Sequence, residues 1–117
     1  MGQLTTHVLD ISAGLPAAGV RIEVHSPGPA PLGLLATTAT GDDGRCAAPL
    51  LAGGDFRAGR YVLTFYLAEY FRGRGIELAD PPFLEEAVIR IGISDPDQRY
   101  HVPLLVSPWS YSVYRGG

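Results

Sequence analysis

The sequence has no lysine, a single cysteine and no long hydrophobic run. All nine basic residues are arginine, and with 12 acidic residues they leave a net charge of −3. A weakly acidic chain without basic clusters is a poor candidate for binding nucleic acid or anionic membranes. The lone Cys46 excludes an internal disulfide framework and a zinc site built from several cysteines. These absences favour a reducing compartment, and we expect the cytoplasm.

Membrane attachment is not expected either. No apolar stretch approaches the roughly 20 residues that a membrane span requires, and no signal-peptide pattern opens the chain. Residues 1–6 match the loose pattern for N-myristoylation. The apolar alternation already begins at Leu4, however, and leaves almost no free arm for a lipid. We therefore expect an unlipidated chain.

The length and composition predict one domain spanning residues 1–117. Hydrophobic residues make up 46% of the 117 positions, which is enough to form a core. The 15 glycines and 10 prolines are spread through the chain as turn signals, without the period of a fibrous protein. This distribution argues against a helix bundle.

Short segments with strand character recur between these turns. Apolar and polar residues alternate most clearly in residues 4–10 and 20–25, and residues 61–67 have the high β propensity of a central strand. Residues 68–74 carry the only helix-like pattern. The expected strands are 4–10, 20–25, 34–40, 45–50, 61–67, 87–94, 100–106 and 111–114. The sequence thus predicts an all-β, antiparallel β-sandwich of about eight strands with one short helix.

Three histidines are the candidates for acid–base chemistry, because imidazole titrates near neutral pH. They are His7, His25 and His101. An isolated histidine on a strand is more often a packing or surface residue, and this interpretation suits His25 best. No H-x-H or H-x-x-x-H spacing and no acidic cluster accompanies them, so we expect no metal site.

A tight turn at residues 41–44 leads into Arg45 and Cys46. Its two aspartates, Asp42 and Asp43, fit turn formation better than acid–base catalysis. Taken alone, Arg45 would be a solvated charge, and Cys46 a small core residue whose pKa the neighbouring arginine could lower. The sequence contains no nucleophile elbow, phosphate loop or dinucleotide fingerprint.

Three separated motifs stand out: LTTHVLD at residues 4–10, GRC at 44–46, and YHVPLL at 100–105 followed by SP at 107–108. YRG follows them at residues 114–116. In this order they resemble the transthyretin-related 5-hydroxyisourate hydrolases over essentially the whole chain. The resemblance implies a transthyretin-like fold, catalysis without a cofactor, and a homotetramer that is a dimer of dimers with sites at the subunit interface.

The implied reaction is hydrolysis of a cyclic amide in urate degradation. It converts 5-hydroxyisourate, the unstable product of urate oxidation, into 2-oxo-4-hydroxy-4-carboxy-5-ureidoimidazoline. The residues that match the family's catalytic set are His7, Arg45 and His101. The residues expected to bind substrate are Arg45 together with Tyr114, Arg115, Gly116 and Gly117.

These assignments agree with the needs of amide hydrolysis: an activated water, a proton for the leaving nitrogen and a countercharge for the oxyanion. His7 and His101 would share the first two tasks, in either order, and the guanidinium of Arg45 would meet the ring oxygens. The family usually ends Tyr-Arg-Gly-Ser, whereas this sequence has Gly117. One missing orienting hydrogen bond costs about 0.5–1.5 kcal/mol, so we expect reduced or retuned activity at most. If that hydroxyl handles the proton or the nucleophilic water, the loss would be far larger.

Two other functions fit the strands alone. A transthyretin-like carrier would hold a small molecule without chemistry, and a bare sandwich would serve as an interaction domain. A carrier is expected to lose the polar set of His7, Arg45 and His101, which this sequence keeps.

Overall fold

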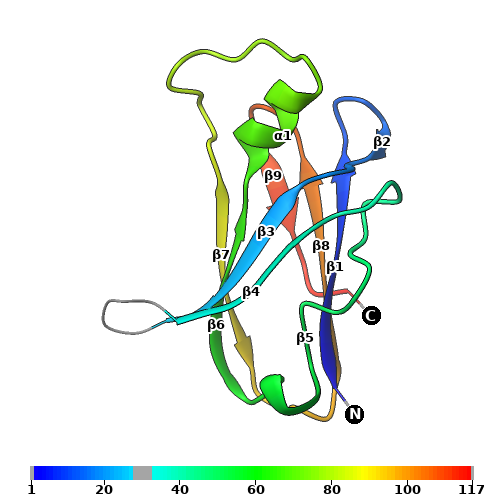
Figure 1. Cartoon of the computed structure of the whole chain (residues 1–117), viewed down its shortest axis with the longest axis vertical. Coiled ribbons are helices and arrows are strands. Elements are labelled where there is room, and N and C mark those ends of the chain that lie inside the picture. Colours follow the sequence, from blue (N-terminus) through cyan, green and yellow to red (C-terminus); the bar gives the residue numbers. More distant parts are fainter. Residues whose placement is uncertain (1, 28–32, 117) are drawn as a thin grey trace.

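Two β-sheets face each other in the computed structural model, which describes residues 2–27 and 33–116 (Figure 1). The strands are β1 (Gln3–Asp10), β2 (Leu15–Pro16), β3 (Arg21–Ser26), β4 (Gly33–Ala39), β5 (Leu51–Ala52), β6 (Gly59–Phe65), β7 (Ala87–Ile93), β8 (Arg99–Val106) and β9 (Tyr111–Val113). A 3-10 helix spans Gly53–Asp55, and the α-helix α1 spans Leu67–Gly73. The predicted two-sheet sandwich with one short helix is confirmed.

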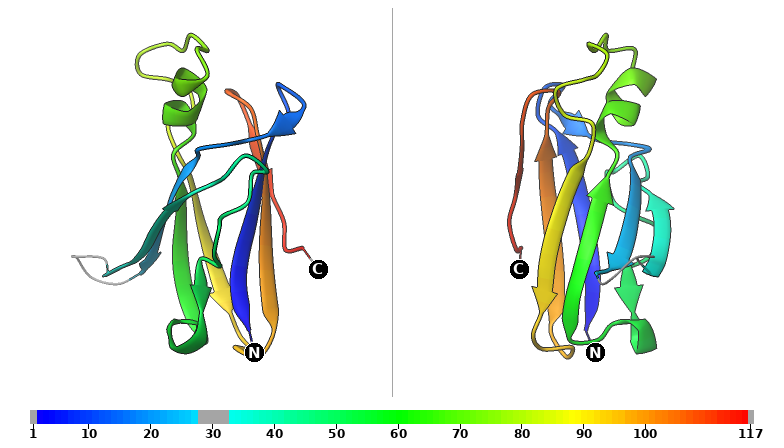
Figure 2. Two further views of the ribbon diagram at one scale, coloured as in Figure 1. Left: turned by 45° about the vertical axis from the view of Figure 1, so that its right-hand side comes forward. Right: turned by 90° about the vertical axis from the view of Figure 1, so that its left-hand side faces the viewer.

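The first sheet has the order β2-β1-β8-β9, with β5 also paired to β1, and the second has the order β4-β3-β6-β7. Figure 2 shows the two layers nearly edge-on, with β7 and β9 on the same side of the molecule. Residues 61–67 were expected to form a central strand, and β6 does lie between β3 and β7. One pairing differs from the expected antiparallel pattern, because β1 and β8 run parallel. A parallel pair needs a long connection, and here the whole second sheet supplies it.

The core forms where the alternating strands present their apolar faces to the opposite sheet. Leu4 and Val8 of β1 are fully buried, and so are Ile22 and Val24 of β3. The intervening residues of β1 are half-buried, as period-2 geometry requires. The alternation predicted for residues 4–10 and 20–25 agrees with the burial of these two strands, and the partly exposed face of β1 carries Thr5 and His7.

The strand expected at residues 45–50 is wrong. Only Arg45 makes a bridge, to His7, and regular pairing resumes at β5. Pro49 has no N–H to donate to a sheet ladder, which explains the break. The N–H of Leu50 then bonds to the carbonyl of Leu4, 2.7 Å away, and returns the chain to β1. Residues 45–50 are therefore an irregular segment lying against β1.

A buried carboxylate fastens α1 to the end of β1. Asp10 is 1% exposed and accepts hydrogen bonds from the Tyr70 hydroxyl at 2.9 Å and from the Arg74 guanidinium at 2.7 Å. The backbone N–H groups of Ser12 and Ala13 donate to its other oxygen. Burial alone raises the pKa of Asp10, but these hydrogen bonds and the charge of Arg74 outweigh it and lower that pKa.

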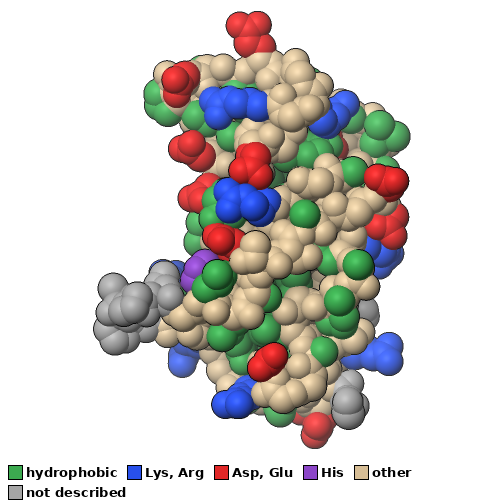
Figure 3. Space-filling model, in the orientation of Figure 1, with side chains coloured by type: hydrophobic (Ala, Val, Ile, Leu, Met, Phe, Trp, Pro, Cys, Tyr) green, Lys and Arg blue, Asp and Glu red, His purple; other side chains and the backbone are tan. Residues whose placement is uncertain are grey.

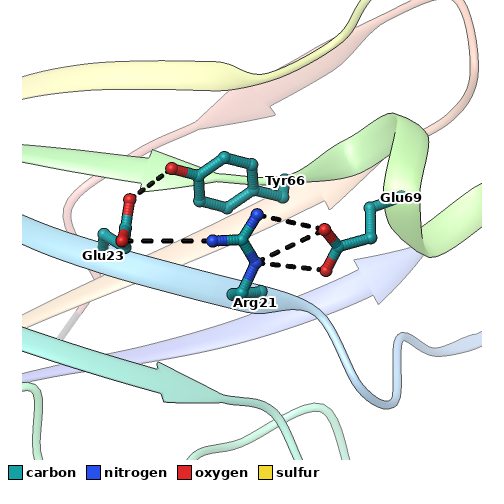
Figure 4. Close-up of polar contacts among 4 residues, drawn as sticks. All are labelled: Arg21, Glu23, Tyr66 and Glu69. Carbon is teal, nitrogen blue, oxygen red and sulfur yellow. Dashed lines mark hydrogen bonds and ion pairs between the residues drawn. The ribbon is translucent and has the colours of Figure 1, made fainter.

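A second, more exposed contact joins β3 to the start of α1 (Figure 4). The Arg21 guanidinium stacks 3.6 Å from the centre of the Tyr66 ring and donates to both carboxylate oxygens of Glu69. The Tyr66 hydroxyl donates in turn to Glu23. The polar groups of these four side chains are paired with one another, and the contacts hold the start of α1 against β3.

On the face seen in Figure 3, acidic and basic side chains are interspersed and do not gather into a basic patch. In the described part of the chain, no helix combines the length and the apolar character needed to cross a membrane.

Candidate active site

The outer face of β1 and β8 carries the two histidines singled out above. In the parallel register, Thr5 is opposite His101 and His7 is opposite Pro103. Thr5 and His7 are two residues apart on one strand, so both lie on the same face as His101. All three side chains are partly exposed on this face, while the neighbouring Thr6 and Val102 point into the core.

The His7 ring is held by the turn at residues 41–44. Its Nε2 atom lies 2.8 Å from the carbonyl oxygen of Asp43. A carbonyl can only accept, so Nε2 carries the proton of this bond, and neutral His7 has its lone pair on Nδ1. Gly44 lies behind the ring with φ of 79°, where an added Cβ would come within 3.1 Å of Cδ2 and 2.3 Å of the Val8 carbonyl oxygen. Only glycine fits there.

The same turn places Arg45 beside His7. The N–H of Gly41 bonds to the Arg45 carbonyl at 2.7 Å, and the Asp43 carboxylate accepts the N–H of Arg45 at 2.9 Å. A bridge between Arg45 and His7 then fixes the backbone against β1. The role of Asp43 in turn formation agrees with the expectation, and its carbonyl adds a contact to His7 that the sequence did not indicate.

The His101 ring is held from both sides. Its Nδ1 atom lies 2.8 Å from the Thr5 hydroxyl on β1. On the β9 side, the N–H of Gly116 bonds to the His101 carbonyl at 2.7 Å, and a Cβ on Gly116 would lie 2.9 Å from Cδ2. With Nδ1 turned to one neighbouring strand and Cδ2 to the other, the distal edge of the ring, including Nε2, points away from the sheet.

Electrostatics keep His101 neutral. Burial lowers the pKa of His101, and the nearby charges of Arg45 and His7 lower it further. The three residues that the motifs assign to catalysis are therefore close enough to influence one another, although they come from both ends and the middle of the sequence.

An open groove of about 440 Å³ adjoins these residues. Thr5 and Arg45 line it, together with Gln3, Cys46 and residues 47–49. Burial raises the pKa of the Cys46 thiol, so the thiol stays protonated at neutral pH. The lower pKa that the neighbouring Arg45 could have caused is not found. Cys46 packs against the core and forms part of the wall. Among the described residues, no group of three or more His, Cys, Asp or Glu side chains could hold a metal ion.

The tail residues divide between the two faces of the sheet. Gly116 lies directly opposite His101. Arg115 points the other way: its guanidinium stacks 4.0 Å from the centre of the Tyr100 ring and donates to the Gln98 side chain. Within a single chain, Gly116 therefore lies beside His101, whereas the Arg115 guanidinium lies on the other face of the sheet. Tyr114 is exposed beside Arg115, and Gly117 lies outside the described residues.

Thr5 and Gly44 contribute to the site without having been predicted. Thr5 is two residues before His7 in an alternating strand, so the sequence already put both on one face. Its contact with His101 depends on the register between β1 and β8, which no local pattern reveals. Gly44 was assigned only to the turn.

Comparison with known proteins agrees with these observations. A 5-hydroxyisourate hydrolase of Pseudomonas aeruginosa is 53% identical over 116 residues, covering 99% of this chain and 92% of that protein. The solved structure of Klebsiella pneumoniae 5-hydroxyisourate hydrolase matches with a TM-score of 0.82 at 35% identity and covers all of both chains. That of (S)-allantoin synthase matches with a TM-score of 0.91 at 48% identity, and this chain spans 44% of its length.

The transthyretin-like fold expected from the motifs is confirmed, because the solved structure of sea bream transthyretin also matches, with a TM-score of 0.85 at 27% identity over 97% of this chain and 94% of that one. A family model described as HIUase/Transthyretin matches residues 4–116, which is nearly the whole chain. The chain belongs to the HIUase/Transthyretin family.

Proposed function

We propose that this protein hydrolyses 5-hydroxyisourate, opening a ring amide to give a carboxylate-bearing ureidoimidazoline. The observation that carries the proposal is the convergence of His7, His101 and Arg45 on one outer sheet face beside a groove. The relatives named for this activity match over nearly their full length, which supports the same chemistry here.

The reaction needs a base for water, a proton for the leaving nitrogen and stabilisation of the oxyanion. The two imidazoles share these tasks with Arg45, and each presents a different ring nitrogen beyond its anchoring hydrogen bond. The guanidinium of Arg45 supplies several N–H donors and a fixed charge to the substrate oxygens. Gly116 and the tail around it close the β9 side of the site.

Polar character separates this proposal from a carrier function. Gln3, Thr5, Thr6 and Arg45 give the groove polar groups beside Cys46 and residues 47–49, and His101 lies opposite Thr5 on the neighbouring strand. A pocket for an apolar ligand is built mainly from hydrophobic and aromatic side chains with few polar groups. The structure therefore favours hydrolysis.

We also propose that the protein works as a homotetramer, a dimer of dimers, in the cytoplasm. The site lies on an open sheet face, where a second subunit would exclude water. The edge strands β7 and β9 lie on one side of the molecule (Figure 2) and carry the exposed apolar residues Val88, Tyr111 and Val113. Unpaired edges with apolar side chains favour association with another copy. The single unpaired thiol of Cys46 suits a reducing compartment.

The activity is tested by generating 5-hydroxyisourate from urate with urate oxidase and following its ultraviolet absorbance. The protein should accelerate the decay well beyond the spontaneous rate. Decay at the spontaneous rate in the presence of protein would refute the enzyme assignment.

The site is tested with His7→Ala and His101→Ala, which should each abolish the acceleration while the protein elutes from a sizing column unchanged. His25→Ala is the matched control, because His25 lies on β3 in the other sheet and should leave the rate unchanged. Full activity in either site variant would remove that histidine from the mechanism.

A further inference from the structure

We propose that Thr5 is a positioning residue whose hydroxyl donates to Nδ1 of His101 and fixes the tautomer that carries its proton on Nε2. His101 then presents an N–H to the substrate, whereas His7 presents a lone pair. The catalytic meaning of this arrangement rests on the proposed hydrolysis, but the tautomer itself is a property of the free protein and is tested separately.

The first support is the geometry around the His101 ring. The Thr5 hydroxyl lies 2.8 Å from Nδ1, across a pair of strands whose register sets these two residues side by side. Gly116 closes the opposite edge of the ring at Cδ2. The hydrogen bond to Thr5 sets the ring orientation, with Nδ1 toward β1 and Cδ2 toward Gly116, so Nε2 is the nitrogen left for substrate.

The second support concerns the direction of the hydrogen bond. Within residues 2–27 and 33–116, the Thr5 hydroxyl has one hydrogen-bond partner, the Nδ1 atom of His101. A hydroxyl has a single proton and two acceptor lone pairs, and solvent reaches the lone pairs of this partly exposed side chain when its proton is directed to Nδ1. The bond is therefore best satisfied when Thr5 donates, which places the proton of neutral His101 on Nε2.

The charged and titratable groups around His101 keep the ring in its neutral form. They are His7 on the neighbouring strand β1 and Arg45 on the turn that packs against β1, and both lower the pKa of His101. Arg115, on the tail beside β8, points to the other face of the sheet. A neutral imidazole has only one N–H, so its tautomer decides whether it can donate to the substrate at all.

His7 is fixed in the complementary state. The Asp43 carbonyl holds the proton on Nε2 of His7, so its Nδ1 lone pair is free. In the resulting step, Nδ1 of His7 takes a proton from water as the water oxygen bonds to the amide carbon. Nε2–H of His101 and the Arg45 guanidinium stabilise the oxyanion, as a neutral histidine can do. The C–N bond then breaks, and His7 returns the proton to the leaving nitrogen.

The tautomer is measured directly by long-range ¹H–¹⁵N NMR of the free protein labelled with ¹⁵N-histidine. Three histidines give a simple spectrum, and His25 serves as an internal reference outside the site. At a pH where His101 is neutral, its Nε2 should show the shift of a protonated nitrogen and its Nδ1 that of a bare one. A proton on Nδ1 of His101 would overturn the proposal, whether or not the protein hydrolyses 5-hydroxyisourate.

Variants at Thr5 test the role of the hydroxyl. Thr5→Val keeps the shape and β propensity but removes the donor, so His101 should become a mixture of tautomers and kcat should fall about tenfold, with a smaller change in KM. Thr5→Ser restores the donor and should keep the wild-type spectrum and a kcat within about threefold.

Thr6→Val is the matched control. The Thr6 hydroxyl donates to the Val102 carbonyl at 2.7 Å across the same two strands, but on the core side. Its loss should lower Tm while leaving the His101 tautomer and the pH dependence of kcat unchanged. The proposal would be overturned if Thr5→Val left both the His101 tautomer and kcat unchanged. It would also be overturned if Thr6→Val changed the tautomer as much as Thr5→Val does. A wild type with the expected tautomer but without hydrolysis would refute the proposed function alone.

Discussion

Both imidazoles of the site are packed against a glycine and anchored by one ring hydrogen bond. Gly44 lies behind His7, and Gly116 lies beside His101. The anchors are the Asp43 carbonyl for His7 and the Thr5 hydroxyl for His101. At Gly116 a small steric change should affect the chemistry more than the fold, whereas at Gly44 the positive φ and the nearby Val8 carbonyl make glycine necessary for the turn itself.

Gly116→Ala should lower kcat about tenfold, because the new Cβ would lie 2.9 Å from Cδ2 of His101 and must push the ring or the tail aside. Steady-state kinetics with a thermal melt would check this, and Tm should change little. Gly54→Ala is the matched control, since a Cβ at Gly54 meets no atom within 4 Å. Equal kinetics in the two variants would contradict the close packing at His101.

Arg45→Gln should raise the pKa of His101, because a positive charge that opposes its protonation is removed. An NMR titration of the His101 ring protons measures the shift. Arg115→Gln should leave that pKa in place, because its guanidinium stacks on Tyr100 at the other face.

The catalytic candidates could be named from sequence motifs, but the residues that hold and orient them could not. The motifs named His7, Arg45 and His101, and the structure brings all three to one face. Thr5 remained unassigned because its partner is 96 residues away, and nothing in a local pattern specifies that register. The sequence also could not show toward which face of the sheet the Arg115 side chain points, because the tail motif has no alternating pattern that would assign its residues to faces.

Among the elements, alternating strands were predictable and irregular connections were not. The inner faces of β1 and β3 follow directly from period-2 alternation. Residues 45–50 have no such period, and Pro49 interrupts the ladder that a return strand would need. The parallel pairing of β1 with β8 also escaped prediction, because alternation identifies a strand's face but not its neighbour.

The junction of β1 and α1 depends on the buried carboxylate of Asp10. Asp10→Asn removes a charge that accepts from Tyr70, Arg74 and two backbone N–H groups, so the free energy of unfolding should fall by about 2 kcal/mol or more. Urea denaturation measures this loss. Glu69→Gln, which weakens the exposed contact of α1 with Arg21, is the control and should cost much less.

The same carboxylate predicts a pH dependence. The pKa of Asp10 is lower in the folded than in the unfolded state, so its stabilisation is complete above the unfolded value of about 4 and is lost as the pH falls through the folded value. Wild-type stability should therefore decline more steeply below about pH 4 than that of Asp10→Asn. Parallel curves from urea midpoints at a series of pH values would contradict this contribution.

For the whole molecule, the proposed docking edges β7 and β9 are compared with the edge strand β4, which also carries exposed apolar residues. Val113→Arg places a charge on β9 where we propose that another copy docks, so it should shift the protein to smaller species in sedimentation velocity. Leu35→Arg makes the same kind of change on β4, at the other edge of the second sheet, and should leave the assembly intact. A tetramer in the Val113→Arg variant would place the interface elsewhere.

The parallel pairing of β1 with β8 also has a kinetic consequence. It joins positions 96 residues apart, whereas β3, β4, β6 and β7 are connected through nearer neighbours in the chain. Contacts between distant positions are slow to form because the chain entropy lost in closing the loop comes first. The pairing of β1 with β8 should therefore form later than the pairings within the second sheet. During refolding, activity should return no earlier than Thr5 and His101 come into register, so turnover can be used to follow the formation of this strand pair.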